Sequence, residues 1–518
     1  MRPLNGATEL SYTLPAMMVR AREALRPVGP LGLVLLTVVF VLAFAACRNV
    51  ESDAEASDVV ASPPPNLLLI TIDTLRADRL SAYGHERQTS PTLDRLAAEG
   101  VRFERAAVQW PKTGPSFASM FTSTYPSQNG IVRHVGIELP CAFRMLAEEL
   151  RAAGYSTHAV VSNGAVASEL HYDQGFDTYV ETWKVEPTPS GPDPSTAGGV
   201  TDLAIRAVED FADGAPYFLW VHYLDPHFPY TAPGDYLDLY VDDEYFEPVR
   251  EIQVADNPDQ QMVQLGYSRV LSGRTDLGFY LARYDSEIAY TDAEVDRLLE
   301  ALGGRGLLDD TLTAVTSDHG ESLGEHHYYF DHGRFGFQTC LHVPLIVHAP
   351  ERLEPRVVDR PVELVDLAPT LLEAAGVALP DGRWAQGRSL WPLLRGEARD
   401  ADEHQLAFSE AGVAHNRRWQ HVVQSSEHKL IYTRAKQEQQ FIGGIGDQLV
   451  LYDLRSDPGE TRNVAGEQPV VFEDLRRRLW TQVNAEPFEV LREEETCGGD
   501  SEGLSSETEA QLRALGYL

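Results

Sequence analysis

Residues 66–78 have the sequence NLLLITIDTLRAD, in which an apolar run over 66–72 is followed at once by Asp73. An apolar run of this length is typical of a strand that is buried on both faces of a parallel sheet. Comparable runs, separated by helical patterns, predict an α/β fold with a central, mostly parallel sheet. The further strands are predicted at 157–161, 217–223, 311–317 and 343–348, and the helices at 92–99, 143–153, 201–211 and 283–302.

The alternation of strands and helices stops near residue 380, so residues 66–380 are predicted to form the main domain. Residues 381–485, with a strand at 449–454 and an amphipathic helix at 472–483, predict a smaller α+β subdomain. The segment 486–518 is expected to be an acidic tail that ends in a short helix. One large domain and one small domain agree with a length of 518 residues.

The composition excludes some classes of function. The chain has 43 Lys and Arg residues against 78 Asp and Glu residues, a formal net charge of −35 that disfavours binding to nucleic acid. Its four cysteines (Cys47, Cys141, Cys340 and Cys497) have no CxxC spacing, so neither a zinc knuckle nor a disulfide-rich scaffold is indicated. Cys141 and Cys340 are more simply explained as buried free thiols, with a disulfide between them as the alternative.

Residues 1–47 have the features of an export signal. Three arginines (Arg20, Arg22 and Arg26) precede an apolar run at 31–46 that ends in small residues before Cys47. The run is shorter than the roughly 20 apolar residues of a permanent span. The ending Ala-Ala-Cys47 resembles a bacterial lipoprotein box, although Phe44 stands where Leu is usual.

We therefore expect lipidation of Cys47, with an uncleaved anchor or simple secretion as alternatives. Residues 48–65 are acidic and then Ser-Pro-Pro-Pro, a composition that suits a tether between the membrane and the folded part. All three alternatives place the folded part outside the cytoplasm, in the cell envelope, on the periplasmic face or at the cell surface.

Two predicted strands end in acids, Asp73 after the first and Asp318-His319 after the strand at 311–317. Ligands of α/β proteins bind at this edge of the sheet. An isolated Asp after a strand is more often a helix cap, and an isolated His is more often structural. Together, two carboxylates and an imidazole suit a divalent cation.

A candidate nucleophile lies in the segment WPKTGPSFASMFTSTYP at residues 110–126. Pro115 favours the first turn of a helix that runs to about Ser123, which places Thr113 just before the helix N-terminus. Free backbone N–H groups there favour an oxyanion, and a hydroxyl beside a cation is a plausible nucleophile. Taken alone, Thr113 is more simply explained as a helix cap or turn residue.

Six motifs in one order over residues 66–480 resemble the sulfatase family of the alkaline phosphatase superfamily. The resemblance implies an α/β/α sandwich, a metal held by Asp73, Asp318 and His319, and a metal-bound nucleophile at Thr113. Besides residues 66–78, the motifs are PKTGPSFASMFTSTYPSQNGI (111–131), YLDPHFPY (223–230), TSDHGESLGEHH (316–327), HVPLIV (342–347) and LYDLRSDPGETRNVA (451–465).

The chain also departs from the family's pattern. Sulfatases carry a Cys or Ser that is converted to formylglycine in the signature C/S-x-P-S-R, whereas this chain has Thr113 and, in place of the Arg, Phe117. Threonine cannot become formylglycine. Thr74 replaces the second acid of the usual Asp-Asp pair, and His319 replaces the usual Asn. The imidazole favours Zn²⁺ or Mn²⁺ over Ca²⁺ or Mg²⁺, which are also possible. The site resembles superfamily phosphodiesterases and phosphotransferases that use threonine directly.

The resemblance extends to the substrate side. His227 matches the family's substrate-side histidine, His332 lies where members carry a substrate-binding or leaving-group residue, and Arg334 is a candidate anion clamp. One metal is expected, because Asp225 lacks the spacing to a histidine that a second site needs. Three other histidines are expected to be structural or solvent-facing, namely His222, His326 and His327.

The sequence thus predicts an exported hydrolase of sulfate or phosphate esters in which Thr113 attacks and a histidine such as His332 protonates the leaving oxygen. Its partners would be a small-molecule, glycan or lipid ester and, through the N-terminus, the membrane. The alternatives are an envelope phosphoryl-group transferase and a binding protein on a sulfatase scaffold.

The export signal gives a first testable prediction. In a bacterial host, the wild type should enter the membrane fraction and incorporate labelled fatty acid, and the Cys47→Ala variant should not, because the acceptor thiol is gone. Unchanged labelling of the variant would contradict lipidation at Cys47 but not export through an uncleaved anchor.

Overall fold

The fold is that of a computed structural model of the chain. The structure describes residues 63–132, 137–189, 191–209, 211, 214–241, 251–252, 254–255, 265–266, 271, 273–379, 385–397, 406–413, 418–434, 448–484 and 503–517. The signal segment, Cys47 and most of the tether lie outside these residues, so lipidation and tethering stay predictions. None of the described helices combines the length and the apolar character that a membrane span requires.

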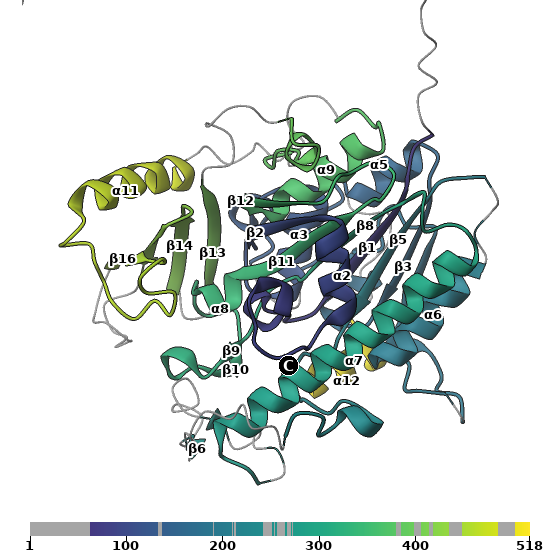
Figure 1. The fold of residues 1–518 in the computed structure, drawn as a ribbon, viewed down its shortest axis with the longest axis horizontal. Helices are drawn as coiled ribbons and strands as arrows, with labels where there is room; N and C mark the ends of the chain where they lie inside the picture. The colour runs from purple at the N-terminus through teal and green to yellow at the C-terminus, as the bar shows by residue number, and fades with distance from the viewer. Residues whose placement is uncertain are drawn as a thin grey trace, which may run out of the picture. The chain divides into compact units, whose positions relative to one another are not determined.

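A sheet of eight strands forms the centre of the main domain, in the order β12-β2-β11-β8-β1-β5-β3-β4 (Figure 1). All neighbours pair in parallel except β11, which is antiparallel to β2 and β8. The prediction of a mostly parallel sheet is therefore confirmed. The strands are β1 (Asn66–Ile72), β2 (Val101–Ala107), β3 (Ser156–Val161), β4 (Thr178–Glu181), β5 (Tyr217–Tyr223), β8 (Thr311–Thr316), β11 (His342–His348) and β12 (Arg356–Glu363).

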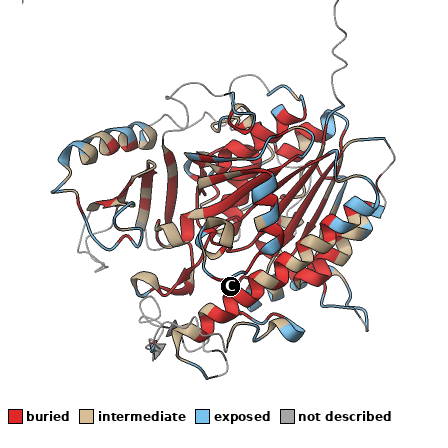
Figure 2. Cartoon of the chain, viewed as in Figure 1, coloured by how far each residue is buried: buried red, intermediate tan, exposed pale blue. Residues whose placement is uncertain are grey.

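Both faces of the sheet are covered, and alternate side chains of β1 enter two different cores. Leu67 and Leu69 belong to the core with α3 (Thr113–Thr122), α5 (Leu146–Ala152) and α9 (Leu367–Ala374). Leu68 and Ile70 belong to the opposite core, with α2 (Pro91–Glu99), α6 (Ala197–Glu209) and α7 (Leu277–Gly304). The central strands β1, β5 and β8 are buried along almost their whole length, whereas β4 at the edge of the sheet is only half-buried (Figure 2). The layers are those of an α/β/α sandwich, as the resemblance implied.

The smaller subdomain is an antiparallel four-stranded sheet, β13 (Ala407–Val413), β14 (Arg418–Gln424), β15 (His428–Arg434) and β16 (Gln448–Asp453), covered by α11 (Pro469–Val483). Leucines of the sheet and of the helix form its core. The predicted α+β character is thus confirmed. The remaining described α-helices and β-strands are α4 (Pro126–Asn129), α8 (Gln338–Leu341), α10 (Trp391–Leu394), α12 (Ser506–Ala514), β6 (Val254–Ala255), β7 (Leu265–Gly266), β9 (Ser322–Leu323) and β10 (Tyr329–Asp331).

The two described cysteines differ in state. Cys141 is disulfide-bonded, whereas Cys340 is a free, buried thiol. Free thiols at both positions and a disulfide between Cys141 and Cys340 are therefore both wrong. Burial raises the pKa of the Cys340 thiol to about 12, which makes it a poor nucleophile.

A buried ion pair joins the small sheet to the main domain. Lys429 of β15 lies 2.9 Å from Glu460, and both side chains are inaccessible to solvent. Glu460 also accepts a hydrogen bond from the backbone N–H of Gln338, at the start of α8, at 2.6 Å. Glu460 thus binds Lys429 of the small sheet and Gln338 of the main domain.

We expect Lys429→Ala to lower the free energy of unfolding by about 3–5 kcal/mol, because it leaves a buried carboxylate without its cation. Replacing both partners, as Lys429→Met with Glu460→Gln, should recover part of that loss. Arg455→Ala, which removes an exposed pair with Glu427, is the matched control and should change little. Denaturant unfolding measures all three, and equal losses for Lys429→Ala and Arg455→Ala would contradict the prediction.

Candidate active site

Two buried acids meet at the end of neighbouring strands. Asp73 follows β1 and Asp318 follows β8, and both side chains are fully buried. One oxygen of each is bound: Asp73 Oδ2 accepts from Asn163 Nδ2 at 2.6 Å, and Asp318 Oδ1 accepts from the backbone of His319 at 2.9 Å. The other oxygen of each, Asp73 Oδ1 and Asp318 Oδ2, has no hydrogen-bond partner within the described part of the chain.

Burial makes these carboxylates costly to ionise. It raises the pKa of Asp73 to about 7, and together with the charge of Asp73 it raises the pKa of Asp318 well above its usual range. Two adjacent acids of this kind are stable as anions only beside positive charge. The pair therefore has the character of a cation site.

His222 completes this pair. It lies on β5, next to β1, and its Nε2 atom is 3.6 Å from Asp73 Oδ2. One ligand atom each from Asp73, His222 and Asp318 lie within 4.8 Å of one another. His222 therefore does not face solvent, and its place beside the acids makes it a candidate metal ligand that was not predicted from the sequence. Its position one residue before the end of a buried strand was the available signal.

The tautomer of His222 follows from its neighbours. Thr71 Oγ1 lies 3.0 Å from His222 Nδ1, accepts from the Trp220 indole at 2.9 Å and donates to the Val221 carbonyl at 3.4 Å. This pattern is satisfied when His222 Nδ1 carries the proton and donates to Thr71. The Nε2 lone pair then faces the acids, and burial lowers the pKa of His222 to about 4, which keeps the ring neutral.

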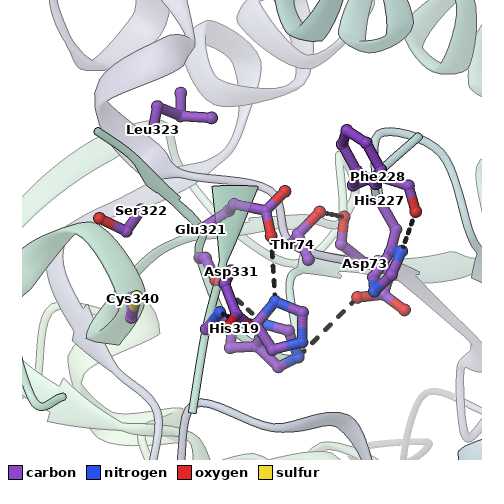
Figure 3. Close-up of polar contacts among 12 residues, drawn as sticks. Asp73, Thr74, His227, Phe228, His319, Glu321, Ser322, Leu323, Asp331 and Cys340 are labelled. Atoms are coloured by element: carbon purple, nitrogen blue, oxygen red, sulfur yellow. Dashed lines mark hydrogen bonds and ion pairs between the residues drawn. The ribbon is translucent and has the colours of Figure 1, made fainter. Parts of the chain in front are cut away.

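His319 also lies beside the acids, and Figure 3 shows it with Asp73. Its Nε2 atom is 3.3 Å from Asp318 Oδ2 and 3.9 Å from Asp73 Oδ1. Its Nδ1 atom donates to the Gly320 carbonyl at 3.0 Å, which leaves a lone pair on Nε2. Burial lowers the pKa of His319 well below its usual range. The donor set of two carboxylates and two neutral imidazoles fits a divalent cation.

Thr113 is brought to this cluster by α3. The helix begins at Thr113, one residue earlier than predicted, and the side chain is fully buried. Thr113 Oγ1 lies 3.3 Å from His319 Nε2. The hydroxyl of Ser116 donates to the Asp318 carbonyl at 2.6 Å and so fixes the helix start against the acids. The free N–H groups of this first turn favour an anion beside Thr113.

His332 and His227 form the outer wall of the site. His332 Nδ1 lies 3.0 Å from Glu321 Oε1, and the same carboxylate accepts from the Tyr230 hydroxyl at 2.7 Å. The His332 ring centre is 4.2 Å from that of His319 and 5.4 Å from that of His227. The structure thus brings together six predicted site residues: Asp73, Thr113, His227, Asp318, His319 and His332.

Comparison with known proteins agrees with this geometry. Residues 65–377 match the family described as Sulfatase, and residues 324–487 match the C-terminal region of N-sulphoglucosamine sulphohydrolase. The chain belongs to the sulfatase family. It is therefore assigned to a family of ester hydrolases.

The relatives have low sequence identity to this chain, although the matches cover most of their length. Choline-sulfatase of Rhizobium meliloti is 26% identical over 80% of this chain and 87% of its own. A multifunctional alkaline phosphatase superfamily protein, PehA of Trinickia caryophylli, is 25% identical over 78% of this chain and 91% of its own. The structure of BT4656 with its substrate D-glucosamine-2-N,6-O-disulfate has a TM-score of 0.68, at 22% identity over 82% of this chain and 99% of that protein.

Phe117, which stands where the sulfatase signature has an arginine, packs against other aromatic rings. Phe117 is fully buried, and its ring centre lies 4.9 Å from those of both Trp220 and His222. An apolar ring beside His222 supplies no charge to a substrate anion. It restricts the ring of His222 by packing instead.

Besides His222 and Glu321, three further residues that the sequence did not predict contact the site: Lys112, Asn163 and Tyr517. The positive charge of Lys112 acts on Asp73 and lowers its pKa, against the larger effect of burial. Asn163 holds Asp73, and the Tyr517 hydroxyl lies 2.8 Å from His227 Nε2. Lys112 stands directly before Thr113 in the sequence, which was a usable signal, whereas Tyr517 had none.

Three further side chains named in the sequence analysis have contacts outside the acid pair. Arg334 forms an ion pair with Asp331 at 3.5 Å and is about one-third exposed, so its role as an anion clamp stays a prediction. The His326 ring stacks on Phe337 with centres 3.7 Å apart, and His327 is exposed. These two histidines are structural and solvent-facing, as expected.

The acid pair predicts how stability depends on pH. The folded, cation-free protein keeps the Asp73 proton to about pH 7, while the unfolded chain loses it near 3.8. Such a group makes the cation-free protein less stable as the pH rises from about 4 to 7. Added Zn²⁺ or Mn²⁺ should therefore raise the Tm more at pH 8 than at pH 5.5.

Calorimetry with metal analysis tests this prediction. Asp73→Asn should remove the Asp73 contribution to the pH dependence, and Asp318→Ala and His222→Ala should each lower the bound metal. Full metal content in both alanine variants would contradict the site.

Proposed function

We propose that this chain is an exported, metal-dependent hydrolase of phosphate or sulfate esters that uses Thr113 as its nucleophile. The observation that carries the proposal is the buried Thr113 hydroxyl at a helix N-terminus, 3.3 Å from His319 and beside the acid pair. A nucleophilic hydroxyl needs a base nearby and positive charge to stabilise it as it loses its proton. Both are present around Thr113.

In the proposed first step, the Thr113 oxygen attacks phosphorus or sulfur, and its proton passes to an imidazole of the site. A divalent cation held by Asp73, Asp318, His222 and His319 would supply positive charge where negative charge develops. Lys112, beside Thr113, and the N–H groups of α3 add further positive potential for the anionic group. The step forms a Thr113 ester and breaks the bond to the alcohol.

His332 is suited to protonate the leaving oxygen. With Nδ1–H directed to the Glu321 carboxylate at 3.0 Å, the protonated ring presents its second N–H at Nε2. Glu321 stabilises the charged ring and is itself held by Tyr230. After alcohol departure, the neutral ring takes a proton from the water that hydrolyses the Thr113 ester, which restores His332.

The chemistry of threonine favours phosphorus over sulfur. A formylglycine hydrate can expel sulfate by elimination, whereas a threonine ester must be cleaved by attack on the central atom, which phosphorus tolerates better. The relatives include both a choline-sulfatase and a multifunctional alkaline phosphatase superfamily protein, so the family covers more than one ester type. We propose a small-molecule, glycan or lipid ester as the substrate.

The cellular location proposed for the enzyme is the cell envelope. It rests on the apolar run at 31–46 that ends at Cys47 and on the Pro-rich tether before Asn66. A tether of this composition would hold the catalytic domain close to the membrane surface, where lipid and glycan esters are found.

The Thr113 variants test the proposal. Thr113→Ala should lose on the order of 10³-fold or more in kcat while metal stays bound, and Thr113→Ser should keep measurable activity because it keeps the hydroxyl. The wild type should show a higher kcat/KM on a phosphate monoester or diester than on the matching sulfate. Strong sulfate preference, or robust activity of Thr113→Ala, would contradict the mechanism.

A further inference from the structure

The C-terminal segment is fastened to the catalytic domain next to the site. The Trp183 indole donates to Thr508 Oγ1 at 3.1 Å, and Gln511 Nε2 donates to the Ser162 carbonyl at 3.0 Å. Thr508 and Leu512 of α12 are fully buried. A Cβ atom added to Gly164 would lie 2.5 Å from the Gln511 side chain, so the contact is close. Figure 1 shows α12 in yellow, and it contacts the short helices η3 (Gly164–Val166) and η5 (Thr182–Lys184) of the catalytic domain.

The turn after α12 directs Tyr517 into the active site. Its backbone N–H donates to the Leu512 carbonyl at 2.8 Å, which fixes the turn. The ring lies beside Lys112, whose Nζ atom is 5.5 Å from the ring centre. The hydroxyl lies 2.8 Å from His227 Nε2 and 3.4 Å from Asn163 Nδ2, and it also hydrogen-bonds with the Thr113 side chain.

The direction of these hydrogen bonds is set by His227. Its Nδ1 atom lies 2.7 Å from the Phe228 carbonyl, which can only accept, so Nδ1 carries the proton (Figure 3). In the neutral ring Nε2 is then an acceptor, and the Tyr517 hydroxyl must donate to it. With its one proton used, the Tyr517 oxygen accepts from Thr113, whose hydroxyl also has a second acceptor, His319 Nε2, at 3.3 Å. The result is a directed line, Thr113 O–H to Tyr517 O–H to His227 Nε2.

We propose that Tyr517 is a catalytic residue that passes the proton of Thr113 to His227 as the threonine oxygen attacks. This inference rests on the proposed function and names the path by which its nucleophile is activated. The Thr113 O–H bond breaks as a Tyr517 O–H bond forms, and the former Tyr517 proton binds His227 Nε2. Tyr517 is neutral before and after, and the positive charge appears on His227.

The same line works in reverse when the covalent ester is hydrolysed. Water attacks the central atom, the bond to the Thr113 oxygen breaks, and that oxygen regains a proton from Tyr517. Tyr517 is replenished by His227, which returns to its neutral form, while His332 accepts the proton of the water. Two histidines thus have separate tasks, His227 on the nucleophile and His332 on the leaving group and water.

The test compares Tyr517→Phe, which keeps the ring and removes only the hydroxyl, with the wild-type full chain. We expect kcat for 4-nitrophenyl and phenyl phosphate esters to fall on the order of 10²-fold or more, with KM, Tm and metal content little changed. Because Tyr517 acts on the nucleophile, the loss should be similar for both leaving groups, whereas His332→Ala should harm the poorer phenyl group more. Arg513→Ala, on the exposed side of α12, is the matched control and should match the wild type.

A second measurement does not depend on turnover. Phenylmethanesulfonyl fluoride should form a Thr113 sulfonate with loss of fluoride, and mass spectrometry should show slower labelling in Tyr517→Phe. If the labelling of Thr113 depends on Tyr517 but the wild type hydrolyses no ester, this inference stands and the proposed function is defeated. If the wild type hydrolyses esters and Tyr517→Phe has the same kcat and the same labelling rate, this inference is defeated and the proposed function stands. Higher activity after removal of residues 517–518, or no labelling of wild-type Thr113, would also overturn the inference.

Discussion

Two carboxylates that are removed from water without a full set of partners dominate the active site. Asp73 and Asp318 leave neighbouring parallel strands at the same edge, and each keeps one buried oxygen without a hydrogen bond among the described residues. A fold does not gain stability from such a pair, because desolvation of a carboxylate costs several kcal/mol. A bound cation would turn the two unfavourable groups into ligands, so the arrangement has the character of a cation site.

The other elements of the site are built around this pair. β5 brings His222 beside Asp73, and the start of α3 is fixed to the Asp318 carbonyl by Ser116. Asn163 contacts Asp73 with one end of its side chain and caps the short helix η3 (Gly164–Val166) with the other. This short helix is part of the surface on which the C-terminal segment packs. The acids, the nucleophile and the C-terminal segment are thus linked through few hydrogen bonds.

Two signature residues of the family are replaced in this chain, and the scaffold is unchanged. To act as a nucleophile, the secondary hydroxyl of threonine must lose its proton to an acceptor. Phe117 fills the place of an arginine with a ring that packs on Trp220 and His222. Positive potential in the site comes from Lys112, which acts on Asp73, and from the helix N-terminus beside Thr113, and a bound cation would add to it. The site combines a sulfatase fold with a threonine at the position of the proposed nucleophile, and that proposal needs no formylglycine maturation.

The sequence by itself determined the central strands, the mostly parallel sheet and the acids at the strand ends, because burial on both faces produces apolar runs and parallel strands share one carboxyl edge. The sandwich was implied by the resemblance to the sulfatase family. The sequence also placed Thr113 at a helix start, since Pro115 marks a first turn. Only the tertiary structure decided that His222 joins the acids and that Tyr517 reaches His227. Local periodicity reports which face of an element is buried, but it carries no information on which distant segment packs there. That choice depends on the path of the whole chain, which brings the last turn of the protein to the first strand of its sheet.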